Sequence, residues 1–483
     1  MCSWTRRTFM AGTLSAAALS LAADGAARGG ADRRGTTGRG ANGTGATGYF
    51  PSHGDFGYDV SGYDLRLSYL PRGRALDAVT RVTASVAEPR KAVAFDLASR
   101  LDVTAVEVNG APAPFRHRQG KLRIAPATAL LPGKPFTTTI RYRGRPAPVR
   151  TPFGSIGWDY TGGSPAGVVV ASQPLGAPSW FPCNDRPDDK AAYRIAATVP
   201  DDLHVVANGV LHDRSPGPGR TCTWTYEHAN PMASYLASVQ VGRFAFSSQS
   251  GGPVPIRNAF PERLGALFAH DFGRQPEMMR FFERLFGPYP FEVYGSVVVD
   301  AELDEPVENQ TYALFGTNHL DGRRTSEHLV AHELAHHWFG NSVSLTDWQH
   351  IWLNEGFATY SEWLWSEHSG GPAARHLAAQ NWSDLADDAQ RMRIASPGPA
   401  KLFDDRVYSR GACTLHALRA TLGDHTFFGI LRNWATRYRH SSAGTEEFIA
   451  HAEQHSHRPL RSLLHAWLYN RRLPPLPDEQ ETA

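Results

Sequence analysis

Cysteine is scarce in this chain of 483 residues, and the four that occur lie far apart. No two of them have the Cys-x-x-Cys spacing, so a zinc site built from paired thiolates is not expected. The three that lie beyond the first fifty residues, Cys183, Cys222 and Cys413, cannot all pair with one another. One disulfide is compatible with the sequence, but a chain of this length needs none.

A strong charge of either sign is also missing. The formal net charge is +2 and no stripe of basic residues stands out, so we expect no nucleic acid partner. Hydrophobic residues make up 41% of the chain and charged residues 20%, which is the balance of an ordinary globular protein. The length suits two or three domains better than one.

The N-terminus lacks an apolar run long enough to cross a bilayer. The apolar stretch at residues 9–23 is short and rich in Ala, Ser and Gly, and Arg6 and Arg7 precede it. This is the layout of a secretory signal, and residues 6–10 (RRTFM) resemble a bacterial twin-arginine export signal. We predict a signal peptide over residues 1–27, a secreted extracytoplasmic protein, and no membrane span in the mature chain.

The segments after the signal differ in composition. Residues 28–48 have no large apolar side chain, which predicts a disordered linker. Residues 49–248 alternate polar and apolar side chains, with hairpin signals at Asn109-Gly110 and Asn208-Gly209. We therefore expect an α+β multidomain protein that begins with an open, twisted, antiparallel β-sandwich.

The second domain, residues 249–478, should be mostly helical and is followed by a short tail over 479–483. Apolar spacing predicts a helix over 270–286, and a strand over 294–299 follows it. Another helix should begin at Thr325-Ser326-Glu327 and end near Gly340-Asn341. The further helices that we expect cover residues 353–367, 411–422, 445–455 and 459–469.

The central motif of the second domain is HELAH at residues 332–336. Positions four apart share one face of a helix, so His332 and His336 can offer their imidazole nitrogens to one metal ion. Glu333 lies on the adjacent flank, where a general base for an activated water would sit. We predict one Zn²⁺ per chain at this motif.

The third ligand decides the subclass of zinc enzyme. A metzincin would need glycine at position 339 and histidine at 342, but Phe339 and Ser342 stand there. Glu355 lies nineteen residues after His336 in an apolar, helical segment, and a Glu from a second helix completes a His₂Glu site with one open position.

Other polar residues near the motif are candidates for supporting roles. We expect His328 and His337 to lie beside the ligands or on the surface, because three ligands already fill a catalytic zinc site. Asp347 and His350 are the candidates for holding the ligands in place. The sequence does not choose between them.

Taken together, these segments resemble the M1 family of zinc aminopeptidases, to which aminopeptidase N and leukotriene A4 hydrolase belong. The likeness rests first on residues 332–341 (HELAHHWFGN) and 352–358 (WLNEGFA). Residues 182–187 (PCNDRP), 305–309 (EPVEN) and 408–411 (YSRG) are similar to three more family segments. The resemblance covers about residues 50 to 478, and implies a saddle-like β domain followed by a thermolysin-like (gluzincin) catalytic domain.

The resemblance also implies roles for individual residues. Glu308 matches the acid that binds the free α-amine of the substrate, with Asn309 beside it, and Gln173 matches a residue that assists there. Tyr408 matches the hydroxyl donor that stabilises the oxyanion. The implied activity is removal of N-terminal residues from peptides with a free amine, which a site lined with acceptors for an ammonium would select.

Two departures from the family pattern stand out. Glu305 replaces the family glycine, which should alter the preference for substrate side chains. The chain also stops where the catalytic domain should end, so we expect a short form without the helical C-terminal domain and with a more open cleft. The alternatives are a thermolysin-like endopeptidase, an epoxide hydrolase with the same zinc site, and an inactive zinc-bound peptide-binding module.

Overall fold

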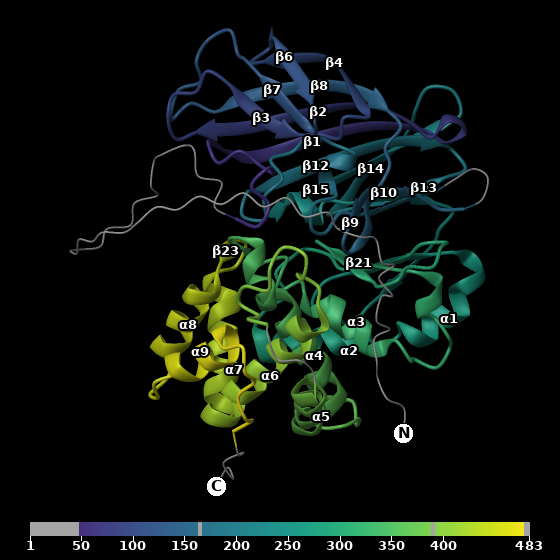
Figure 1. Ribbon diagram of the computed structural model, residues 1–483. Coiled ribbons are helices and arrows are strands. Elements are labelled where there is room, and N and C mark those ends of the chain that lie inside the picture. The colour runs from purple at the N-terminus through teal and green to yellow at the C-terminus, as the bar shows by residue number, and fades with distance from the viewer. Residues whose placement is uncertain (1–47, 163–166, 388–391, 478–483) are drawn as a thin grey trace, which may run out of the picture. The chain divides into compact units, whose positions relative to one another are not determined.

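The computed structural model describes residues 48–162, 167–387 and 392–477 (Figure 1). The predicted signal peptide, all but the last residue of the predicted linker, and the predicted tail lie outside these residues. None of the helices in the described part of the chain combines the length and hydropathy that a bilayer crossing requires.

An eight-stranded sheet dominates the first domain, with strand order β14-β15-β12-β1-β2-β8-β4-β5. Side chains in its strands alternate between core and solvent, as the period of two predicts, so that one face packs inward. All pairings in this sheet are antiparallel except that of β1 with β12. The strands are β1 (Tyr58–Leu70), β2 (Ala75–Val86), β4 (Leu101–Val108), β5 (Ala111–Pro112), β8 (Phe136–Gly144), β12 (Lys190–Pro200), β14 (Val210–Pro216) and β15 (Thr221–Ala233).

Two smaller sheets complete this domain. One has the order β13-β16-β11-β10-β9 and the other the order β3-β7-β6. Their strands are β3 (Val93–Asp96), β6 (Phe115–Arg118), β7 (Lys121–Ile124), β9 (Val149–Thr151), β10 (Gly154–Tyr160), β11 (Val168–Ala171), β13 (His204–Ala207) and β16 (Val239–Gly242). A short 3₁₀ helix, η3 (Ser234–Leu236), precedes β16 and contributes to the site described below.

The two hairpin predictions had different outcomes. At Asn109-Gly110 the prediction is confirmed, because β4 pairs with β5 and both turn residues have positive φ, as a type I′ turn requires. At Asn208-Gly209 it is wrong, because β13 pairs with β16 whereas β14 pairs with β15 in the larger sheet. The chain changes sheets there, and the Asn208 amide donates to the carbonyls of Leu236 and Gln310.

The second domain contains a five-stranded sheet with order β17-β18-β19-β21-β20, in which β20 is an edge strand. Its strands are β17 (Ala245–Gln249), β18 (Ile256–Phe260), β19 (Ser296–Val298), β20 (Val307–Asn309) and β21 (Tyr312–Phe315). The helices, coloured teal to yellow in Figure 1, follow or interrupt these strands. They are α1 (Gly265–Asp271), α2 (Gln275–Phe286), α3 (Glu327–Ala335), α4 (Trp352–His368), α5 (Ala374–Asp387), α6 (Asp405–Leu422), α7 (Asp424–Arg437), α8 (Thr445–Gln454) and α9 (Arg461–Tyr469).

Several helix boundaries differ from the predictions. The helix predicted over 270–286 is divided, because Asp271 ends α1 and accepts hydrogen bonds from the backbone of a distant loop, while Pro276 suits the first turn of α2. Helix α6 begins six residues earlier than predicted, because the Asp404 side chain caps it by accepting from the Arg406 N–H. Helices α5 and α7 were not predicted.

The predicted fold class is confirmed: a mostly β N-terminal domain is followed by a helical domain. The three cysteines of the described chain, Cys183, Cys222 and Cys413, are free and buried. Burial raises the pKa of the Cys183 and Cys413 thiols.

Candidate functional site

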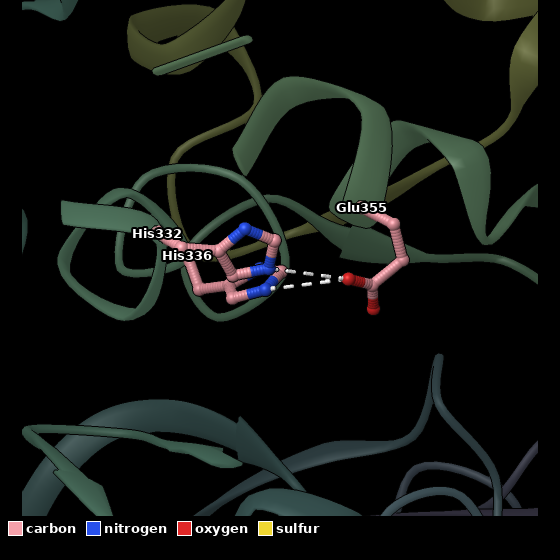
Figure 2. A group of neighbouring side chains, drawn as sticks. All are labelled: His332, His336 and Glu355. Atoms are coloured by element: carbon pink, nitrogen blue, oxygen red, sulfur yellow. Dashed lines mark ion pairs between the residues drawn. The ribbon is translucent and has the colours of Figure 1, made fainter. Parts of the chain in front are cut away.

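Two helices bring the predicted metal ligands together. His332 lies in the last turn of α3, His336 caps the C-terminus of that helix, and Glu355 lies in the first turn of α4. Oε2 of Glu355 is 3.5 Å from Nε2 of His332 and 3.6 Å from Nε2 of His336. Figure 2 shows both imidazole rings directed at this carboxylate. All three side chains are buried.

The Nδ1 atoms of both histidines, which face away from Glu355, already form hydrogen bonds. Nδ1 of His332 lies 2.6 Å from Oε1 of Glu362, and Nδ1 of His336 lies 3.1 Å from the Phe339 carbonyl. Since both partners accept hydrogen bonds, each Nδ1 carries the proton and each Nε2 is left as the donor atom for a metal. A tetrahedral zinc ion needs donor atoms about 3.3 Å apart, close to the separations found here. The residues present therefore fit zinc.

The electrostatics of the cluster follow from burial and proximity. Burial alone would lower the pKa of His332 and His336, but the neighbouring carboxylates raise both to about 9. Burial alone would raise the pKa of Glu355, but the two histidines lower it to about 2. The carboxylate is therefore ionised at neutral pH, as a metal ligand must be.

Glu333 is buried beside the ligands with an unsatisfied carboxylate. Its Oε2 has no hydrogen-bond partner among the described residues, and burial raises the pKa of this carboxyl well above its usual value. A raised pKa suits a group that must take up and release a proton during a reaction. The Tyr408 ring stacks on the ring of His332, with centroids 6.1 Å apart, and so lies at the same cluster.

The predicted amine-binding residues also meet. Glu308, on β20, is buried, and its Oε1 accepts a hydrogen bond of 2.6 Å from Nε2 of Gln173 in the N-terminal domain. Burial raises the pKa of Glu308 to about 7. Asn309 is also buried, but neither polar atom of its side chain has a partner in the described part of the chain.

Glu308 adjoins the predicted metal ligands. Ligand atoms of Glu308, Glu333 and His336 all lie within 4.8 Å of one another. Nδ1 of His336 is hydrogen-bonded to the Phe339 carbonyl, so only Nε2 is left to bind a metal. If Nε2 binds the ion held with Glu355, Glu308, Glu333 and His336 cannot hold a second ion. They form a cluster of buried polar side chains next to the predicted metal centre.

The supporting residues differ from those proposed from the sequence. His337 is buried among aromatic rings and donates to the Glu333 carbonyl, and burial lowers its pKa to about 3. His328 bonds to the Thr325 carbonyl. Asp347 caps a 3₁₀ turn, and His350 bonds to Thr445.

The side chain that contacts the predicted ligand His332 is that of Glu362, which was not predicted from the sequence. It lies seven residues after Glu355, so the two share one face of α4. That spacing is the signal that could have found it.

Two family models match the chain. The Peptidase M1 N-terminal domain matches residues 60–236, and the Peptidase family M1 domain matches residues 270–467. Among curated proteins, Aminopeptidase M1-A of rice (Oryza sativa subsp. japonica) is 25% identical over 457 residues, which cover 84% of this chain and 49% of the relative. Leucine aminopeptidase 2 of Coccidioides immitis is 26% identical over 328 residues, which cover 63% and 52%. The chain thus spans about half the length of these relatives.

Solved structures give a more complete match. An M1 zinc metallopeptidase from Deinococcus radiodurans superimposes with a TM-score of 0.83 at 28% identity, covering 91% of this chain and 100% of that one. A mutant of that protein was solved with a Tyr-Ser-Ala substrate bound. Yeast leukotriene A4 hydrolase shares the fold, with a TM-score of 0.74 at 23% identity over 87% of this chain and 69% of that one.

Proposed function

Because the chain belongs to peptidase family M1, we propose that it is a zinc aminopeptidase that removes N-terminal residues from peptides. Several of its relatives are named aminopeptidases, and its structural neighbours are zinc metallopeptidases. The observation that carries the proposal is the hydrogen-bonded pair of Gln173 and Glu308 beside the candidate metal ligands. A buried carboxylate there is a partner for a substrate ammonium.

In this proposal His332, His336 and Glu355 hold one zinc ion. When bound, zinc supplies a Lewis acid for the scissile carbonyl and lowers the pKa of a water molecule. Glu362 and the Phe339 carbonyl fix the orientation of the two imidazole rings.

Glu333 is the general base in the proposed mechanism. Its carboxylate takes the proton of the attacking water and then delivers that proton to the amine that leaves. The Tyr408 hydroxyl donates a hydrogen bond to the oxygen on which negative charge develops. The stacking of Tyr408 on His332 supports this assignment, because His332 is one of the proposed zinc ligands.

Glu308 and Gln173 act as the anchor for the substrate N-terminus, with Asn309 on the same strand. Glu308 pairs with the ammonium, and Gln173 holds the carboxylate in place. An N-acetylated peptide brings no ammonium, so the buried carboxylate would lose its partner and binding would be rejected. The anchor lies within a few ångströms of Glu333, which selects the first peptide bond for hydrolysis.

We also propose export of the protein by a twin-arginine signal. Arg6 and Arg7 followed by the short apolar stretch at residues 9–23 support it. Replacing both arginines by lysine in the full chain should stop export, which fractionation of the producing cells would detect. Unchanged export of that variant would contradict the proposal of a twin-arginine signal.

The activity is tested with one peptide in two forms, free and N-acetylated, incubated with the zinc-loaded protein. Mass spectrometry should show stepwise loss of N-terminal residues from the free form alone. Internal cleavage of both forms would instead establish an endopeptidase. Cleavage of neither form by protein with zinc bound would contradict catalysis.

A further inference from the structure

A tight turn follows His336, the second of the proposed zinc ligands, and one of its carbonyls accepts a hydrogen bond from the His336 ring. The Phe339 carbonyl accepts the hydrogen bond from Nδ1 of His336, and the Asn341 N–H donates to the His336 carbonyl at 2.9 Å. Gly340, between them, has a φ of +125°, a conformation that side-chain-bearing residues rarely adopt. The orientation of the imidazole therefore depends on the peptide planes of residues 339–342 holding their positions.

The N-terminal domain supplies two of the side-chain donors for this turn, and the Ser344 hydroxyl, which bonds to the Gly340 and Asn341 carbonyls at 2.8 and 3.1 Å, is a third. The Tyr235 hydroxyl, on η3, donates to the Gly340 carbonyl at 3.2 Å. Nζ of Lys190, at the start of β12, donates to the carbonyls of Asn341 and Ser342 at 2.9 and 2.8 Å. Lys190 and Tyr235 lie far from His336 and from each other in the sequence. Together they bond three consecutive carbonyls of the turn, two of which also accept from Ser344.

Lys190 has an unusual environment for a lysine. Among the described residues, no carboxylate forms an ion pair with it, and its hydrogen-bond partners are backbone carbonyls. Burial lowers the pKa of Lys190 to about 7. Its ammonium lies against two adjacent backbone carbonyls of the turn that follows α3. A cation there offsets their mutual repulsion.

The same turn also contacts the strand that carries Glu308. Nδ2 of Asn341 donates to the Asn309 carbonyl on β20 at 3.4 Å. A displacement of the turn would therefore affect both a metal ligand and the strand of the proposed amine anchor.

We propose that Lys190 and Tyr235 are positioning residues, through which the N-terminal domain holds the turn at residues 339–342 and thereby orients His336 for metal binding. This inference deepens the proposed function and rests on its assignment of His336 as a zinc ligand. It assigns the N-terminal domain a part in assembling the metal site, in addition to the contribution of Gln173.

The test measures zinc affinity in the full chain, by competition with a chromogenic chelator. Lys190→Met should weaken zinc binding about tenfold to a hundredfold, the range found when partners of metal ligands are removed. Tyr235→Phe, which removes one hydroxyl, should weaken it less. Lys190→Arg should restore most of the affinity, because guanidinium can also donate to two carbonyls.

Two matched controls separate positioning from general loss of stability. Lys121→Met removes a lysine that bonds to Asp96 and to the Gly54 carbonyl within the N-terminal domain. Tyr226→Phe removes a buried hydroxyl that donates to the Val205 carbonyl. Both should lower the melting temperature and leave zinc affinity unchanged. The visible spectrum of the cobalt-substituted protein, which reports ligand geometry, should change for Lys190→Met and not for the controls.

A folded Lys190→Met protein that binds zinc as tightly as the parent would overturn the inference. So would equal weakening in Lys121→Met, because the effect would then be general. Peptide hydrolysis is assayed separately at saturating zinc. If the parent binds zinc and the affinity pattern holds while no peptide is trimmed, the proposed function fails and the positioning role stands.

Discussion

Oε1 of Glu362 and Nδ1 of His332 lie 2.6 Å apart, although neither residue is adjacent to the other in sequence. Glu355, on the same face of α4, lies 3.5 Å from the other nitrogen of that imidazole. One helix therefore approaches both edges of the ring. The contact with Glu362 fixes the tautomer and directs Nε2 toward the proposed metal site.

Removal of this contact should weaken metal binding without removing a ligand. We expect Glu362→Ala to lose about tenfold to a hundredfold in zinc affinity, because the ring is then free to rotate and its Nδ1 proton has no acceptor. Chelator competition measures the change. Glu367→Ala, five residues further on α4, is the control, because Glu367 bonds to Ala374 and Arg419 instead. Equal affinities in the two variants would rule out the orienting role of Glu362.

Substitutions of the proposed base, Glu333, and of the proposed third ligand, Glu355, should have different effects on turnover and on zinc binding. Glu333→Gln keeps the shape of the side chain but cannot take a proton, so kcat should fall by roughly 10²- to 10⁴-fold while zinc stays bound. Glu355→Ala removes a donor atom, so zinc should be lost. Metal analysis alongside a rate assay distinguishes the two. A Glu333→Gln protein with normal turnover would exclude Glu333 as the base.

Glu308 should determine the discrimination between free and blocked peptides. In Glu308→Gln, kcat/KM for a free peptide should fall about tenfold to a hundredfold, since a hydrogen bond to a charged group contributes about 1.5–3 kcal/mol. The low rate on the N-acetylated form should change little, because that form has no ammonium to lose. If both rates fell by the same factor, Glu308 would be acting on the reaction centre and not on the amine.

A buried histidine makes the fold sensitive to acid. Nε2 of His228 lies 2.6 Å from the Gln310 amide nitrogen and accepts from it, and burial lowers the pKa of His228 to about 3. In the unfolded chain His228 takes up a proton near pH 6.5, whereas in the folded chain it does not. The free energy of unfolding should therefore fall as pH drops from about 6.5 toward 3.

Urea unfolding at a series of pH values measures this dependence. His228→Gln should show a shallower decline, because one titrating group is removed from the balance. His212→Gln, at an exposed position, is the control for the loss of a histidine as such. If the free energy of unfolding of His228→Gln declined with pH as steeply as that of the parent protein, the acid sensitivity would belong to other groups.

The sequence by itself determined the parts of the site that depend on local geometry. His332 and His336 share a face because they are four residues apart on a helix, a spacing that no packing alters. The alternation of side chains predicted the β domain, and the two turn residues at Asn109-Gly110 predicted their hairpin, because both are properties of neighbouring residues.

The tertiary structure alone decided which distant residues meet. Gln173 and Glu308 are 135 positions apart, and Lys190 lies about 150 positions before the carbonyls to which it donates. Asn208-Gly209 has the same local signal as Asn109-Gly110 yet joins two different sheets. Such contacts depend on how the sheets and helices pack over the whole chain, and a local sequence pattern holds no information about that packing.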